Sequence, residues 1–128
     1  MTEIVITSAK RSPIGKFMGT LASLSAPELG KLALDAVIND CKLEKDVIDE
    51  IIMGQVLTGG AGQNPARQAS ISAGIPIEKS ALTINQVCGS GLRAVSVAAQ
   101  SILTNQSNVV IAGGQESMSN AHHTINLR

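Results

Sequence analysis

Short apolar runs alternate with segments of helical periodicity along most of this chain. The runs are rich in Val and Ile, as buried strands are, and we expect four strands, at residues 3–8, 49–56, 81–85 and 108–112. Between them, apolar residues recur every three or four positions, which predicts helices after Ser25, after Asn64 and over residues 89–103. The order βαβαβαβ predicts an α/β fold, with helices on both faces of a parallel sheet.

Local signals mark where the first two helices begin. Ser25 with Glu28 three residues later has the spacing of a capping box. Asn64 followed by Pro65 is a favourable N-cap and first helical position, and Gly74 suits the end of that helix.

The helical spacing also predicts which sides of two helices are apolar. After Ser25 the apolar side comprises Leu29, Leu32, Ala33, Ala36 and Val37. At residues 89–103 it comprises Leu92, Val95, Ala99 and Leu103, widened by Val97, Ala98 and Ile102. We therefore expect the helix at residues 89–103 to be deeply buried. The fourth strand is followed by no further helix, although a buried parallel strand needs cover on both faces, so we expect the chain to stop inside a fold.

Composition and charge narrow the class of protein. Phe17 is the single aromatic residue among 128, so a core of Val, Ile, Leu, Ala and Met is expected. Ten basic residues balance ten acidic ones, and without a basic stripe we expect no nucleic-acid partner. No apolar run approaches the ~18 residues of a membrane span, and the first residues lack the basic region of a signal peptide. We expect a cytoplasmic protein with no membrane partner.

Cys88 is the candidate for chemistry. It lies where the third expected strand turns into the third helix, and the unpaired N–H groups and dipole of a helix start favour a thiolate, the nucleophilic form. Gly89 and Gly91 suit a sharp turn and leave room for a substrate near the sulfur, and the Cys88 N–H is a candidate donor to an oxyanion. The alternative is a small buried cysteine without chemistry, which is how we interpret Cys41.

A rival motif overlaps this turn. Residues 89–94 (GSGLRA) match the dinucleotide fingerprint G-x-G-x-x-A between a strand and a helix. The match falls on the third strand rather than the first, and no acidic residue ends a strand about 20 residues later. Dinucleotide binding would also leave Cys88 unexplained.

Four motifs, in order along the chain, resemble those of the thiolase family. Residues 85–95 (NQVCGSGLRAV) resemble its active-cysteine motif, and residues 113–119 (GGQESMS) its G-G-x-E-x-M-S signature. Residues 11–17 (RSPIGKF) and residues 54–56 with 62–69 (GQV and GQNPARQA) are similar to two further family segments. The resemblance is strongest to the branch of acetyl-CoA acetyltransferases, the biosynthetic acetoacetyl-CoA thiolases. It identifies residues 1–128 as an incomplete N-terminal half of the thiolase fold.

This resemblance implies an acyltransferase. The cysteine at position 88 would attack an acyl-CoA thioester, and the acyl enzyme would take part in condensing two acetyl-CoA into acetoacetyl-CoA, or in the reverse thiolysis. No metal and no redox cofactor are implied, and complete members are dimers or tetramers. The activating His, a second catalytic Cys and the coenzyme A loop would lie after Arg128, so we expect the isolated chain to be inactive.

Several alternatives stay open beside this interpretation. One is a noncatalytic half that pairs with a separate C-terminal chain, because the open edge of the fourth strand favours pairing. A related condensing enzyme of the ketoacyl synthase type is a closer alternative than a dinucleotide-binding module, although the GQNPARQA and G-G-x-E-x-M-S resemblances favour a thiolase over it. His122 and His123 are interpreted as surface or interface residues, and adjacent residues on an extended chain point apart, so no shared metal site is expected.

Overall fold

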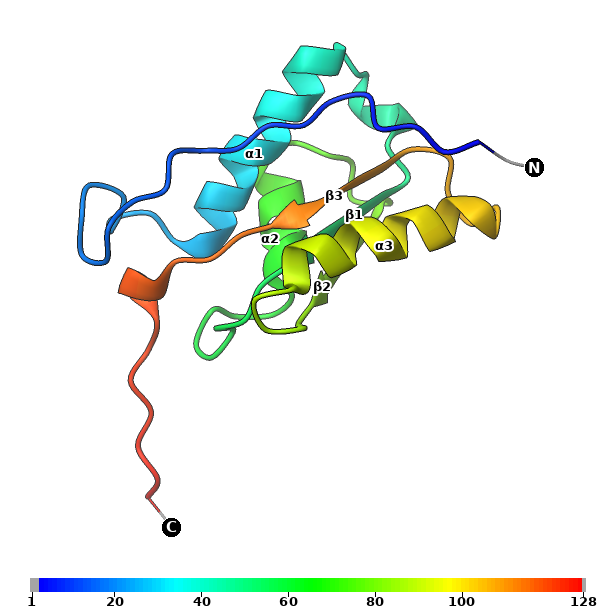
Figure 1. Cartoon of the computed structure of the whole chain (residues 1–128). Helices are drawn as coiled ribbons and strands as arrows, with labels where there is room; N and C mark the ends of the chain where they lie inside the picture. The colour runs from blue at the N-terminus through cyan, green and yellow to red at the C-terminus, as the bar shows by residue number, and fades with distance from the viewer. Residues whose placement is uncertain (1–2, 128) are drawn as a thin grey trace.

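The computed structural model describes residues 3–127, which are built around a three-stranded parallel sheet (Figure 1). Its strands are β1 (Glu50–Gly54), β2 (Ser80–Ile84) and β3 (Val110–Gly114), in the order β2-β1-β3. Gly54 pairs with Ile84 on one side and with Gly114 on the other, so the carboxyl ends of all three strands lie level. The α/β class with a parallel sheet is confirmed.

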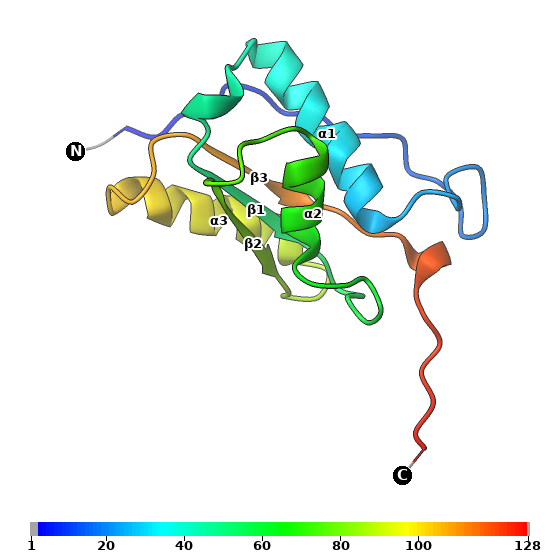
Figure 2. The ribbon, with the colours of Figure 1, turned by 180° about the vertical axis from the view of Figure 1, so that it is seen from behind.

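Helices cover both faces of this sheet. Helices α1 (Ala26–Cys41) and α2 (Pro65–Ser72) lie on one face and α3 (Ser90–Leu103) on the other, as the two opposite views show (Figures 1 and 2). Two short 3-10 turns, η1 (Lys45–Val47) and η2 (Met118–Asn120), complete the described elements. The core is aliphatic, as expected, and Phe17 lies exposed at the surface. Within residues 3–127, no helix combines the length and the apolar character that crossing a membrane requires.

Both expected helix starts are confirmed. The Ser25 hydroxyl accepts a hydrogen bond from the Glu28 N–H, and the Glu28 carboxylate accepts one from the Ser25 N–H at 2.8 Å. Asn64 Oδ1 accepts a hydrogen bond from the Arg67 N–H at 3.2 Å. Both helices therefore begin where the polar side chains satisfy free N–H groups.

The first expected strand, residues 3–8, is wrong. That segment is extended but belongs to no sheet, and Val5 and Ile6 are 65% and 78% exposed rather than buried. It is instead held on α1, where Asp40 accepts a hydrogen bond from Ser8 and forms an ion pair with Lys10, both at 2.7 Å. A strand needs a hydrogen-bonded neighbour, and an open hollow lies between this segment and β3.

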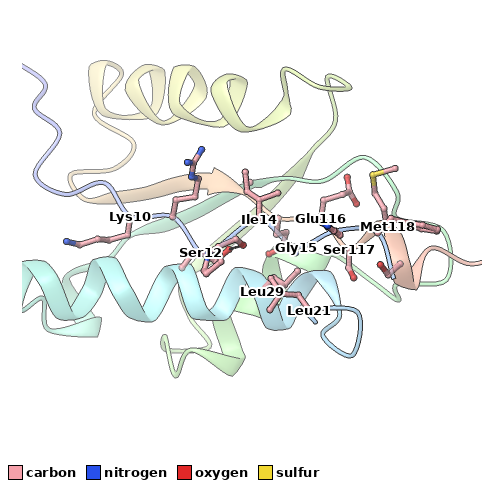
Figure 3. A pocket seen from close by; sticks show the side chains of 17 residues that line it. Lys10, Ser12, Ile14, Gly15, Leu21, Leu29, Glu116, Ser117 and Met118 are labelled. Atoms are coloured by element: carbon pink, nitrogen blue, oxygen red, sulfur yellow. Dashed lines mark hydrogen bonds between the residues drawn. The ribbon is translucent and has the colours of Figure 1, made fainter. Parts of the chain in front are cut away.

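That hollow and its continuation form what we call the edge groove. The first part, about 460 Å³, is bounded by the N-terminal segment, β3, α1 and α3. The second part, about 360 Å³, runs between residues 10–17 and 114–119 (Figure 3). Lys10 lines both parts, and a hydrogen bond of 2.8 Å from the Met18 N–H to the Ser119 hydroxyl joins the two walls beyond residue 17.

The expected apolar sides of α1 and α3 are right only in part, since Ala98 is buried as expected whereas several of the larger residues are exposed. On α1 the buried positions include Gly30, Leu34 and Ile38, whereas Leu32 is exposed. On α3 small residues face the sheet, half-buried Val97 packs beside them, and several larger side chains point away. The buried ones are Ser90, Ala94, Ala98 and Ser101, and the exposed ones include Leu92, Val95 and Leu103. Small residues let α3 pack closely on the strands, so it is buried on one side only.

Candidate active site

Cys88 lies in the tight turn that joins β2 to α3. The residue is exposed, whereas Cys41 is half-buried on α1 with its thiol 3.5 Å from the Thr7 hydroxyl. Helix α3 begins at Ser90 with Gly89 as its N-cap, so Cys88 comes two residues before the first helical residue. The hydrogen bond from Arg93 N–H to Gly89 C=O, 2.8 Å, is the first of the α-helical pattern. The N–H groups that precede Arg93 in the helix are the ones a helix start leaves without α-helical partners.

The sharpest backbone feature of this turn is at Val87, immediately before Cys88. Its φ angle is +51°, in the left-handed region, which costs a β-branched residue on the order of 1–3 kcal/mol. The conformation is held by hydrogen bonds to both polar groups of Val87. Its N–H donates to Asn85 Oδ1 at 2.9 Å, and its C=O accepts from the Ser90 N–H at 3.1 Å and from the Ser90 hydroxyl at 2.6 Å.

The two glycines of the turn have a different setting from the one we expected. Gly89 has a φ of −86°, and the φ of Gly91 is not positive either. Neither therefore supplies the left-handed conformation, which falls on Val87. What the two glycines still offer is the absence of side chains on the helical side of Cys88, and their place in the site remains a prediction.

Glycines at the strand ends, by contrast, have a clear steric reason. A Cβ on Gly54 would lie 2.5 Å from the Ser90 carbonyl carbon and 2.7 Å from the Gly91 nitrogen. A Cβ on Gly114 would lie 3.4 Å from the Gly91 Cα. The start of α3 thus rests directly on the carboxyl ends of β1 and β3. Gly54 is a site residue that sequence reasoning missed, although its place at the end of an apolar run was a usable signal.

Polar side chains tie the segments after the three strands together beside this turn. The Glu116 carboxylate, after β3, accepts the Val56 N–H at 2.8 Å, and Asn85, after β2, donates from Nδ2 to the Val56 C=O at 3.3 Å. Buried Gln115 donates to the side chain of buried Gln55 at 2.9 Å. The sequence placed Glu116 in a motif but did not reveal its bond to Val56 or the Gln55–Gln115 pair. In both cases the two bonded residues lie 60 positions apart in the chain.

A shallow hollow of about 280 Å³ lies over these strand ends. Its lining residues come from the ends of β1 and β3 and from the turn, and they are Gly54, Gln55, Val56, Val87, Ser90, Gly91, Gly114, Gln115 and Glu116. Cys88 follows Val87 but does not line the hollow, and among residues 3–127 no hydrogen bond or ion pair reaches its sulfur. The arrangement presents an accessible thiol beside a helix start, which suits attack on an electrophile.

The two histidines, His122 and His123, lie in the segment that follows η2. Both are exposed, and the His122 ring packs on Gly60, where an added Cβ would approach its Cγ to 2.5 Å. Within the described part of the chain, no three His, Cys, Asp or Glu side chains come together as metal ligands would. His122 therefore packs on the loop after β1.

Residues 4–128 match the thiolase N-terminal domain family. The chain is 52% identical over 125 residues to the acetyl-CoA acetyltransferase of Cupriavidus necator, covering 98% of this chain and 32% of that protein. It is 45% identical over 126 residues to the mitochondrial acetyl-CoA acetyltransferase of Bos taurus, covering 98% of this chain and 30% of the other.

A solved structure has the same fold. The Acat5 thiolase of Ascaris suum, crystallised in complex with coenzyme A, superposes with a TM-score of 0.89 at 42% identity. The superposition covers 92% of this chain and 31% of that one. The chain thus spans about a third of the length of the curated relatives and of the structure that it matches.

Proposed function

The chain belongs to the thiolase family through its N-terminal domain, and on this premise we propose that Cys88 is the nucleophile of an acetyl-CoA acetyltransferase. The observation that carries the proposal is the exposed Cys88 in a tight turn at the start of α3. The relatives' names support acetyl-CoA and acetoacetyl-CoA as the substrates, and favour a thiolase over a condensing enzyme of the ketoacyl synthase type.

In the proposed reaction, the Cys88 thiolate attacks the carbonyl carbon of acetyl-CoA. The C–S bond to coenzyme A breaks, coenzyme A leaves as a thiol after taking up a proton, and an acetyl thioester remains on Cys88. A second acetyl-CoA, deprotonated at its α-carbon, attacks this thioester, which forms acetoacetyl-CoA and restores the Cys88 thiolate. Thiolysis is the same sequence reversed.

The chain's own contribution is to orient and expose the sulfur and to offer N–H groups at the helix start. The absence of side chains at Gly89 and Gly91 leaves room for the thioester beside Cys88, and the Cys88 N–H is the proposed oxyanion donor. Since no described residue forms a hydrogen bond or ion pair with the Cys88 sulfur, the base that removes the α-proton is assigned to the part of a thiolase beyond this domain. The isolated chain should therefore accept an acetyl group without turning over.

The test is acetyl transfer from acetyl-CoA to the purified, folded chain, followed by intact mass and peptide mapping. We expect slow acetylation of Cys88, none in C88S and normal labelling in the matched variant C41S. Acetoacetyl-CoA should not be cleaved continuously by the chain alone. Equal labelling of the two cysteines would refute the nucleophile, and steady thiolysis would refute the need for further residues.

The edge groove favours a second candidate, a noncatalytic half that pairs with a separate C-terminal chain. Within residues 3–127 no strand lies beside the outer edge of β3, and the adjoining hollow is walled by the apolar residues Val5, Ile6 and Ile111 among others. An exposed edge of this kind accepts an added strand. The occupant we propose is an extended apolar strand from the remaining two-thirds of a thiolase.

Mixing this chain with the remaining part of the Cupriavidus relative tests the pairing. We expect a stable complex, measured by light scattering, and recovered thiolysis. The variant Ile6→Lys puts a charge in the groove and should weaken the complex, whereas Ile77→Lys, similarly exposed but outside the groove, should not. No complex at micromolar concentrations, or equal effects of both lysines, would count against this candidate.

We propose that the complete enzyme is a homo-oligomer and acts in the cytoplasm. Exposed apolar side chains outside the edge groove support an interface, among them Ile71 and Ile77. The two unpaired cysteines, Cys41 and Cys88, suit a reducing compartment. Light scattering on the complete enzyme tests the first point, where a monomer would contradict it, and localisation of a tagged copy tests the second.

A further inference from the structure

The Ser90 hydroxyl bridges the two ends of the turn that carries Cys88. Ser90 is the first residue of α3 and only 4% exposed. Its Oγ accepts the Gln86 N–H at 2.8 Å and donates to the Val87 C=O at 2.6 Å. One side chain thus joins the residue where the turn begins, the strained residue before Cys88 and the helix after it.

Ser90 is itself fixed from the other side. A Cβ on Gly54 would lie 2.6 Å from the Ser90 Cβ, so the serine sits directly on the end of β1. Val87 has no comparable support from packing, because it is 64% exposed. Its left-handed conformation therefore depends on hydrogen bonds. Three of the five hydrogen bonds among residues 85–90 involve Ser90, and the other two are the Val87 N–H to Asn85 Oδ1 and the Gly89 N–H to the Gln86 C=O at 3.1 Å.

We propose that Ser90 is a positioning residue for acyl transfer, a latch that orients the Cys88 sulfur by holding Val87 in its left-handed conformation. The proposal rests on the proposed role of Cys88 as nucleophile. Without the hydroxyl, Val87 would relax towards the negative φ that a β-branched residue prefers, and Cys88, the next residue, would turn with it. Nothing requires Ser90 to touch the substrate.

The matched variants are S90A and S101A. Ser101 is a buried serine of the same helix, and its hydroxyl also makes two hydrogen bonds, to Ser107 at 3.0 Å and to Glu50 at 3.1 Å. Both changes should lower stability, because each removes hydrogen bonds of a buried hydroxyl. Only S90A acts on the turn before Cys88, so only S90A should change the reactivity of that thiol.

The measurement is the second-order rate at which iodoacetamide alkylates Cys88, with Cys41 of the same molecule as the internal reference, and the rate of acetylation by acetyl-CoA. We expect both rates at Cys88 to fall about fivefold to tenfold in S90A, as the loss of one or two ordinary hydrogen bonds allows. In S101A they should stay within about twofold of the parent chain on the same reasoning. S90T keeps the hydroxyl and should recover most of the rate.

A second substitution separates orientation from general loosening. Glycine adopts positive φ as readily as negative φ, so V87G should make the latch less necessary. In the V87G background, S90A should therefore cost less than half of the fold-change that it costs in the parent. If S90A does not fold, S90C carries the test, because it keeps the shape of the side chain and weakens both bonds, and it should also slow Cys88.

The outcomes are distinguishable. Equal Cys88 rates in S90A and S101A, or an S90A effect that is undiminished by V87G, would overturn the latch. If Cys88 of the parent chain is alkylated rapidly but is acetylated no faster than Cys41, the proposed function fails. The latch is then judged by the alkylation rates alone, where the same fivefold fall supports it and its absence refutes it.

Discussion

Replacement of Gly54 by alanine tests how closely α3 is seated on the sheet. The added methyl would lie 2.5 Å from the Ser90 carbonyl carbon and 2.7 Å from the Gly91 nitrogen, closer than real Cβ atoms come to any neighbour. Both neighbours are backbone atoms in the first turn of α3, so no side-chain rotation relieves the contact. The helix start has to move away from β1.

The size of the effect follows from two opposing terms. Forcing a methyl into a packed site costs about 1–3 kcal/mol. Replacing glycine by alanine restricts the unfolded chain, which returns about 0.4–1 kcal/mol. The free energy of unfolding of G54A should therefore be about 1–2 kcal/mol below that of the parent chain, with a Tm about 5 °C lower for a domain of this length.

Urea unfolding followed by circular dichroism measures this difference, and G59A is the matched control. A Cβ on Gly59 meets nothing within 4 Å, so that variant should change stability by less than about 0.5 kcal/mol. The displaced helix start should also slow alkylation of Cys88 in G54A and leave Cys41 unaffected. Equal unfolding free energies for G54A and G59A would refute the close seating of α3 on β1.

Three further predictions concern the hydrogen bonds of single side chains. S25A removes the capping hydroxyl of α1 and should lower the free energy of unfolding by about 1 kcal/mol, measured in urea, and no change would contradict the cap. The N–H of Asn108, followed by that of Val109, lowers the pKa of Asp49, so its stabilisation is present above the unfolded pKa of about 3.9 and is lost as pH falls through the folded value. The stability gap between the parent and D49A should thus shrink on acidification, and a gap independent of pH would contradict this. Hydrogen bonds from Lys10, and then from Ser8, also lower the pKa of Asp40, so acid or the D40N variant should release the N-terminal segment from α1. Proteolysis of that segment, by a protease whose own activity is constant over the pH range, should then be faster. Equal cleavage rates in D40N and the parent chain would contradict the attachment to α1.

Features decided by neighbouring residues could be predicted from the sequence. The caps at Ser25 and Asn64 form within three residues of each helix start, and the structure has both. Strands β1, β2 and β3 lie within one or two residues of their expected bounds, because each is a short apolar run with turn residues around it. The strand–turn–helix setting of Cys88 was predicted for the same reason, since it is local, and its role as nucleophile stays a proposal.

Features decided by distant residues were missed. Helix α1 is apolar around much of its circumference, so periodicity alone does not select Leu34 over Leu32. The packing of α2 selects the side, since Gly30 faces Ala69, where a Cβ would approach to 3.2 Å. The positive φ of Val87 was also not predicted, because sequence rules assign such a conformation to the nearby glycines, Gly89 and Gly91.

The misassigned first strand and the exposed part of the expected apolar side of α3 fit one physical explanation. Ile6 and Leu92 are both 78% exposed, although each belongs to an apolar pattern that predicts burial. An apolar pattern predicts that a side chain will be buried, but it does not say by which part of the protein. Residues 3–127 cover only one side of the segment at residues 3–8 and one side of α3. The edge groove runs between the N-terminal segment and β3, where a further strand would have hydrogen-bonding groups available on the β3 side. Burial of these residues by a second layer would therefore turn both errors into correct predictions, and hydrogen exchange that slows at residues 4–9 and 110–112 when the rest of a thiolase is added would be its signature.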